Sequence, residues 1–111
     1  MNDWELLQNY ARRGSEGAFR TLVERYLNLV HSVATRQVQD AHIAEEVSQA
    51  VFILLARKAA SLKEGILLSG WLFRTTRFVA ARARRAEQRR HQREQEAYQM
   101  QTLTKIGRAH V

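Results

Sequence analysis

The chain has 111 residues, of which 45% are hydrophobic, and its formal net charge is +7. This length suits a single domain, and the positive charge favours a polyanionic partner such as DNA, RNA or an anionic membrane surface. The absence of cysteine excludes disulfides, a thiolate nucleophile and cysteine-ligated zinc. Because the sequence contains neither a transmembrane run nor a signal peptide, we expect a cytoplasmic protein.

The chain contains no proline and is rich in good helix formers, which predicts an all-α fold. Asn2 is expected to cap a first helix over residues 3–13, with Glu5 in the capping-box position. Gly14 is expected to end this helix because glycine accepts the left-handed backbone of a helix C-terminus. We expect a compact bundle of about four helices with an extended polar helix at the C-terminus.

The second and third helices are predicted from their N-caps and apolar stripes. Ser15 begins a helix that runs to about Val38, and Asp40 begins one over residues 41 to about 60. The second helix is expected to bury the stripe Phe19, Leu22, Val23, Tyr26, Leu27, Val30, Val33 and Ala34. The third is expected to bury Ile43, Val47, Ala50, Val51, Leu54 and Leu55.

The other face of the third helix is unusually apolar for a surface that only meets water. It is expected to expose Glu46, Gln49 and either Phe52 or Ile53. Residues 61–69 then break the helical pattern at Gly65 and are predicted to form a loop.

The last helix is expected to start at Gly70, capped by Ser69, and to continue beyond Arg93. Eight arginines lie in residues 69–93, more than in any other stretch of similar length. At about 100° per residue, the predicted core side consists of Leu72, Thr75, Val79, Ala83 and Ala86. The opposite side carries Arg74, Arg77, Arg84 and Arg85.

Trp71 and Phe78, seven residues apart, lie at the boundary between these two sides. Arginine binds phosphate in a bidentate way, and a neighbouring aromatic ring offers a face on which an unpaired base stacks. The pattern therefore favours a nucleic acid with exposed bases. The alternative is that both aromatics are core residues at the edge of the helix. From Glu87 onward, a solvated polar helix is the better interpretation.

Enzyme chemistry has little support in this sequence. His31, His42, His91 and His110 show no metal-ligand spacing, and the chain has neither a glycine-rich phosphate loop nor a nucleophile elbow. We therefore expect a protein that is not an enzyme, without catalytic residues, metal or cofactor.

Three consecutive blocks, AFRTLVERYLNLVHSVATRQVQD, AHIAEEVSQAVFILLARKAASL and GWLFRTTRFVAARARRAEQRR, resemble region 2 of the bacterial sigma-70 family. The similarity covers about residues 18–90 and is greatest to the extracytoplasmic-function (ECF) sigma factors. It implies a DNA-binding transcription initiation factor that binds RNA polymerase core and recognises and melts the promoter −10 element. An anti-sigma factor is a further partner that such a family allows.

The resemblance also implies roles for individual residues. The residues expected to bind the clamp helices of the RNA polymerase β′ subunit are Glu46, Gln49, Phe52 and Leu55. The loop of residues 61–69 and the start of the last helix would capture the −10 non-template strand. The residues expected beside that strand are Trp71, Arg74, Arg77 and Phe78, with Arg84 and Arg85 on phosphates.

The chain departs from many ECF members at positions where those members carry Gln-Glu, Arg-Asn and a following Asp. It has Gln49-Ala50 in the second block and Arg77-Phe78 with Arg82 in the third. Because of Phe78 and Arg82, the detailed base preference of those members is not carried over to this chain, whereas the helical frame is unaffected.

The expected organisation is an N-terminal helix (1–14), a region 2-like domain (15–90), a polar helical linker (91–105) and a tail (106–111). The tail IGRAHV is what one reading frame of a common sequencing adapter encodes, so we expect a fragment that lacks the region 4 helix-turn-helix. Two alternatives remain open. One is a basic helical adaptor that binds an acidic partner or an anionic membrane surface, and the other is a generic nucleic-acid-binding bundle.

Overall fold

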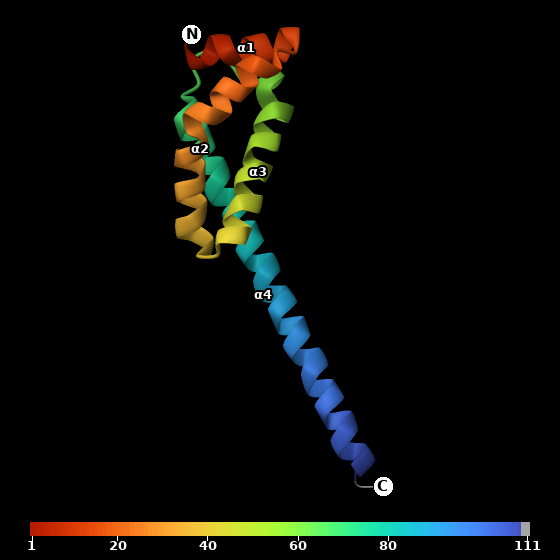
Figure 1. Ribbon diagram of the computed structural model, residues 1–111. Coiled ribbons are helices and arrows are strands. Elements are labelled where there is room, and N and C mark those ends of the chain that lie inside the picture. Colours follow the sequence, from red (N-terminus) through yellow and green to blue (C-terminus); the bar gives the residue numbers. More distant parts are fainter. Residues whose placement is uncertain (110–111) are drawn as a thin grey trace.

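The structure is a computed structural model that describes residues 1–109, and these residues form an all-α bundle, as predicted. In Figure 1, α2 and α3 run in opposite directions, α1 crosses one end of the pair, and α4 packs beside them and extends far beyond. The elements are α1 (Asp3–Arg13), α2 (Glu16–Val38), α3 (Ala41–Lys58), the short 3₁₀-helix η1 (Ala59–Ser61) and α4 (Leu68–Ala109). The predicted tail begins inside α4, and its last two residues, His110 and Val111, lie outside the described residues.

Local capping sets both ends of α1, as the sequence predicted. The Asn2 side chain accepts a hydrogen bond from the Glu5 backbone N–H at 2.8 Å. Gly14 adopts a φ of 67°, and its N–H donates to the Tyr10 carbonyl at 2.9 Å. A residue other than glycine would be strained at this position, because the left-handed backbone crowds a Cβ atom.

The second and third helices begin at their predicted caps. The Ser15 hydroxyl accepts from the Ala18 N–H at 3.2 Å, and the Asp40 carboxylate accepts from the Ile43 N–H at 3.0 Å. The first turn of each helix thus gains a partner for one of its free N–H groups. Gln39 ends α2 in a left-handed conformation with a φ of 54°.

Two predicted boundaries were wrong by about one half-turn. The third helix ends at Lys58, and the chain then tightens into η1 instead of continuing as α-helix to about residue 60. The last helix begins at Leu68, so Ser69 lies inside its first turn and is not its cap. The side chain of Leu68 is only 2% exposed, and its burial anchors this earlier start.

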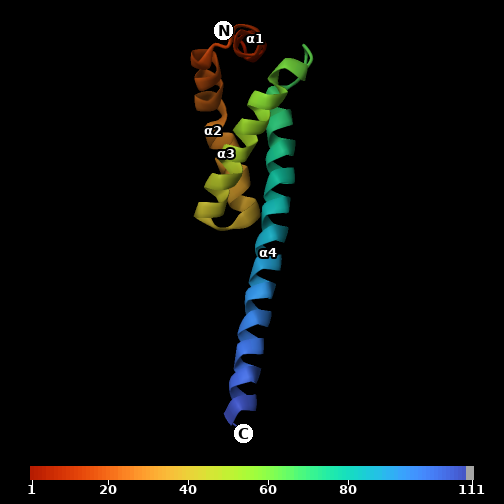
Figure 2. The same ribbon diagram turned by 90° about the vertical axis from the view of Figure 1, so that its right-hand side faces the viewer.

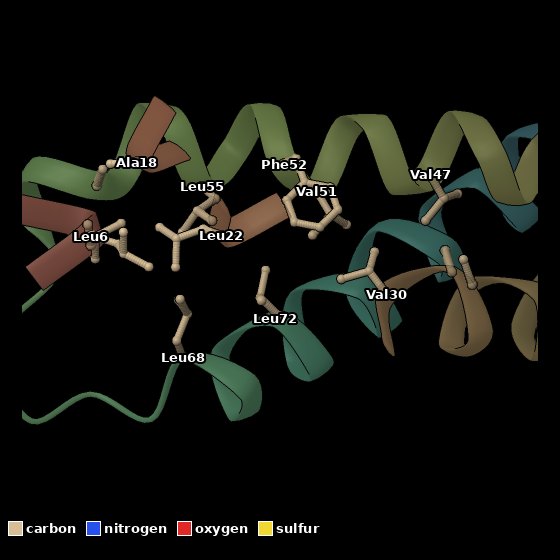
Figure 3. Packing of buried hydrophobic residues seen from close by; sticks show 14 of the residues in the cluster. Leu6, Ala18, Leu22, Val30, Val47, Val51, Phe52, Leu55, Leu68 and Leu72 are labelled. Atoms are coloured by element: carbon tan, nitrogen blue, oxygen red, sulfur yellow. The ribbon is translucent and has the colours of Figure 1, made fainter. Parts of the chain in front are cut away.

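The core lies where α2, α3 and α4 meet, with α1 closing one end. Figure 3 shows Leu22 from α2, Leu55 from α3 and Leu72 from α4 pointing toward one another, and each is fully buried. Burial of a leucine side chain contributes about 1.5–3 kcal/mol. The buried hydroxyls of Ser48 and Thr76 each donate to a carbonyl one turn earlier in their own helix, so neither is left unpaired.

The core face of α4 is rotated relative to the prediction. The buried residues are Leu68, Leu72, Thr76 and Ala80. Of the predicted set, Leu72 is buried, Thr75, Val79 and Ala83 are half-buried, and Ala86 is exposed. The rotation arises because α4 packs against α2 as well as α3, which draws its buried face toward the space between them.

An ion pair and a hydrogen bond hold the start of α1 against the middle of α2. The Asp3 carboxylate lies 2.6 Å from the Arg25 guanidinium and also accepts from the Tyr26 hydroxyl. Partial burial, together with this carboxylate, raises the pKa of Tyr26 to about 12.

The second half of α4 leaves the bundle. Figure 2 shows it continuing as one straight helix away from the other three, and every residue from Gln88 to Gly107 is exposed. The molecule consequently measures 74 Å along its longest axis but only 25 and 20 Å across. None of the helices within residues 1–109 has an apolar stretch long enough to cross a membrane.

Candidate functional site

The outward side of α4 concentrates positive charge that the fold does not neutralise. Among the described residues, Arg90 is the only one of the eight arginines between residues 69 and 93 with an ion pair, to Glu87 at 2.6 Å. This pair raises the pKa of Arg90 by hydrogen bonding and by charge. The other seven arginines are exposed. Their guanidinium groups are available to phosphates.

The six residues predicted to face nucleic acid lie along one continuous side of α4. At about 100° per residue, Arg84, Arg77, Arg74, Arg85, Phe78 and Trp71 follow one another over an arc of about 140°. Arg84 lies at the edge facing α2, where it lines a small polar hollow with Arg36 and Gln39. Phe78 lies at the edge facing α3. The structure thus brings the predicted set together on one surface.

The two predicted aromatics differ in how the bundle holds them. Trp71 is half-buried and packs against the core, whereas the side chain of Phe78 is 59% exposed. The alternative interpretation of an edge-of-core residue therefore describes Trp71 but not Phe78.

Arginines cover both exposed phenylalanines of α4. The Arg82 guanidinium carbon lies 5.7 Å from the centre of the Phe78 ring, and that of Arg77 lies 5.8 Å from the centre of the Phe73 ring. In each pair the guanidinium lies within cation–π distance of an exposed ring. Phe73 and Arg82 were not among the predicted site residues, although each lies four residues from its partner, Arg77 or Phe78, a spacing that brings side chains together on a helix.

The loop before α4 is shorter than predicted, because Leu68 and Ser69 belong to the helix. Gly65 adopts a φ of 90°, and the Ile66 N–H donates to the Lys63 carbonyl at 3.2 Å, so the loop contains a defined turn. Leu67 is 73% exposed beside the buried Leu68. The loop thus presents an apolar side chain next to the arginine side of α4.

A largely apolar groove of about 690 Å³ lies between α2 and α3. On the α3 side, Gln49, Phe52 and Ile53 line it, and on the α2 side, Leu27 and His31 do so. Ile53 and Leu27 are 52% and 44% exposed. Leu27 had been assigned to the buried stripe of the second helix, which was wrong, because its side chain lines this open groove and is not covered by the core.

The four residues predicted to bind polymerase core do not all reach this groove. Gln49 is exposed in it, and Phe52 is only 7% exposed, so Phe52 forms its wall and Ile53 takes the exposed position. Glu46 is exposed and pairs with His42 at 2.9 Å, but it does not line the groove, whereas its neighbour Glu45 does. Leu55 is fully buried in the core and supports the helix without reaching the surface.

A sequence model of the sigma-70 region 2 family matches residues 22–90, more than half of the chain. The chain belongs to the sigma-70 region 2 family. Region 2 of a sigma factor takes part in transcription initiation, with RNA polymerase core and promoter DNA as its partners. Comparison with curated proteins and with solved structures found no match.

The region 2 match contains both surfaces described above. It starts at Leu22, includes the groove between α2 and α3, and ends at Arg90 after the arginine side of α4. Within residues 1–109, no cluster of three or more His, Asp or Glu side chains could hold a metal ion.

Proposed function

We propose that this chain is the core-binding and promoter-melting part of an ECF-type sigma factor, and that it acts by binding and not by turnover. In this proposal the groove between α2 and α3 receives the clamp helices of the polymerase β′ subunit. The outward side of α4 and the preceding loop hold unpaired bases of the −10 non-template strand. The observation that carries the proposal is the region 2 match, which spans both surfaces.

The groove suits a helical protein partner. Its exposed leucine and isoleucine come from two different helices, and Gln49 adds an amide between them. Amphipathic helices bind in grooves of this kind, because their apolar side chains are buried while polar groups at the rim fix their register. Leu27 and Ile53 are expected to give most of the binding energy, and Gln49 to give orientation.

The α4 side suits a single strand better than a duplex. Phosphate contacts by arginine hold the backbone, while Phe78 with Arg82, and Phe73 with Arg77, offer surfaces for stacking. Taking a base out of its stack costs a few kcal/mol, and stacking on a protein side chain offsets this cost.

The alternative of a basic adaptor on acidic proteins or membranes needs only the charge of α4. It gives no reason for the groove between α2 and α3, or for the family match over residues 22–90. A competition assay separates the two. If the chain is a sigma factor, single-stranded DNA should displace it from anionic vesicles. If it is a membrane or acidic-protein adaptor, anionic vesicles should displace it from single-stranded DNA.

The direct test is binding to a purified β′ clamp-helix fragment, measured by calorimetry. Leu27→Ser and Gln49→Ala should each weaken binding by about fivefold to tenfold, which corresponds to about 1–1.4 kcal/mol. Leu67→Ser is the matched control, because Leu67 is an exposed leucine on the loop, away from the groove. If the intact chain does not bind the fragment, or if all three variants weaken binding equally, the groove is not the polymerase surface.

A further inference from the structure

A second groove, of about 600 Å³, lies between α3 and α4 on the side away from α2. Its floor is apolar and comes from both helices, with Ala50 and Leu54 from α3 and Val79 and Ala83 from α4. The alanines are small, so the backbones of α3 and α4 are left less covered here than where leucines meet in the core. This α3–α4 groove is distinct from the groove between α2 and α3 that is proposed for polymerase. Of the residues that line the two grooves, Ile53 alone belongs to both.

Two large apolar side chains stand at opposite rims of the α3–α4 groove. Ile53 is 52% exposed and Phe78 is 59% exposed. Folding of the chain gains little from side chains left this far in water. A partner that covered the groove would bury both at once, which is how apolar anchors of protein interfaces act.

The charges around the groove are of one sign. Arg57 from α3 and Arg82 and Arg89 from α4 line it, and no acidic side chain among the described residues does. Within residues 1–109 none of these three arginines has an ion pair. Glu46, one turn before Ala50 on α3, does not line the groove, and it contributes to the raised pKa of Arg90, which does not line it either. An occupant would therefore have to bring its own carboxylates.

The dimensions fit one helix. The lining residues of α4 extend from Phe78 to Arg89, which is roughly 16 Å at 1.5 Å per residue. This distance equals about three turns of α-helix. Aliphatic side chains of an amphipathic helix would fill the alanine-lined floor, whereas a nucleic-acid backbone would place charged phosphates against it.

We propose that the α3–α4 groove docks an acidic amphipathic helix of a protein partner. Its apolar face would lie on the floor between Ile53 and Phe78, and its carboxylates would pair with Arg57, Arg82 and Arg89. Phe78 also belongs to the side of α4 assigned to the single strand, so such a helix competes with promoter DNA. This competition rests on the proposed function, whereas the docking itself does not.

The test uses two fluorescent peptides of about 18 residues that share one leucine stripe at helical spacing. One peptide carries glutamates on both flanks of the stripe, and the other carries lysines in their place. Fluorescence anisotropy with the intact chain should show a preference of at least about tenfold for the glutamate peptide. A preference below twofold would overturn the proposal, because the arginines would then not select the partner.

Charge-reversal variants locate the binding. The double variant Arg57→Glu/Arg89→Glu should lower affinity for the glutamate peptide about tenfold and raise affinity for the lysine peptide. The control Arg20→Glu/Arg36→Glu makes the same change in net charge at exposed positions of α2 and should leave the preference within about twofold. Circular dichroism confirms that both variants remain folded.

Three outcomes would contradict an acidic helix as the occupant. Equal losses in the groove variant and its control would indicate attraction by net charge alone. Self-association that the groove variant abolishes, seen by sedimentation, would make a second copy of the chain the occupant. Loss of oligonucleotide binding with unchanged peptide binding would assign the groove to nucleic acid. Arg57→Glu/Arg89→Glu should bind the β′ clamp-helix fragment as the parent chain does. Failure of peptide docking is therefore distinguishable from failure of the proposed polymerase binding.

Discussion

Replacing Trp71 and Phe78 separately by alanine should separate a core contact from a nucleic-acid contact. Trp71 is half-buried against the core, so Trp71→Ala should lower the free energy of unfolding by about 2 kcal/mol. For a domain of this size, such a loss lowers the melting temperature by roughly 10 °C. Phe78 is 59% exposed, so Phe78→Ala should change stability by no more than about 0.5 kcal/mol.

Nucleic-acid binding should depend on the two residues in the opposite order, with the larger loss on replacing Phe78. Stacking of a base on an aromatic side chain is worth about 1–3 kcal/mol, and Phe78→Ala also removes the ring beneath the Arg82 guanidinium. We therefore expect Phe78→Ala to weaken binding to a single-stranded −10 oligonucleotide by about tenfold or more, and binding to duplex by less. Trp71→Ala should weaken single-strand binding less than Phe78→Ala when both are measured well below their melting temperatures.

The assay is fluorescence anisotropy with a labelled single strand and the matched duplex, together with thermal unfolding followed by circular dichroism. Phe73→Ala serves as a second exposed ring with its own arginine. A nucleic-acid role for Phe78 is refuted if Phe78→Ala destabilises the chain as much as Trp71→Ala does, because the exposed ring would then be a core contact. That role is also refuted if Phe78→Ala binds the single strand and the duplex with the affinities of the parent chain.

The remaining predictions concern charge and pH. Arg84→Ala should reduce the slope of log affinity against log salt concentration by about 1, because one phosphate contact releases about one counterion. The reduction should be the same for single strands of any sequence. An unchanged slope would show that Arg84 does not contact phosphate. The pKa of Tyr26 is raised to about 12 in the folded chain, above its ordinary value of 10.0. Its contribution to stability is thus complete below pH 10 and is lost as the pH rises toward 12. Tyr26→Phe should abolish the loss of stability that the parent chain shows between pH 10 and pH 12. The measurement compares the unfolding curves of the two proteins across this range. Identical pH dependence would contradict a link between Tyr26 ionisation and stability.

Much of the fold could be predicted from short stretches of sequence. Asn2, Ser15 and Asp40 cap their helices as expected, and Gly14 ends the first. Each of these signals depends on hydrogen bonds within about four residues, so the information lies in neighbouring letters. The family, too, could be predicted from three consecutive blocks, and the match over residues 22–90 confirms it.

The start of α4 shows where local signals failed. Ser69 is a good cap by residue type, yet the helix begins at Leu68 because that side chain reaches the core. The free energy of burying one leucine exceeds the preference for one cap. The sequence could not show this, since the residues that cover Leu68 lie on other helices.

The candidate surfaces depended even more on tertiary structure. A helical wheel places Phe52 and Ile53 about 100° apart, on either side of Gln49, but the packing of α3 against its neighbours buries Phe52 and exposes Ile53. Leu27, which the apolar pattern of its own helix had assigned to the core, is exposed in the groove between α2 and α3. The sequence by itself determined which segments are helical, which family they form and which side of the last helix carries the arginines. Only the packing of three helices at once decided which apolar side chains remain available to a partner, because burial is a property of the neighbours as much as of the residue.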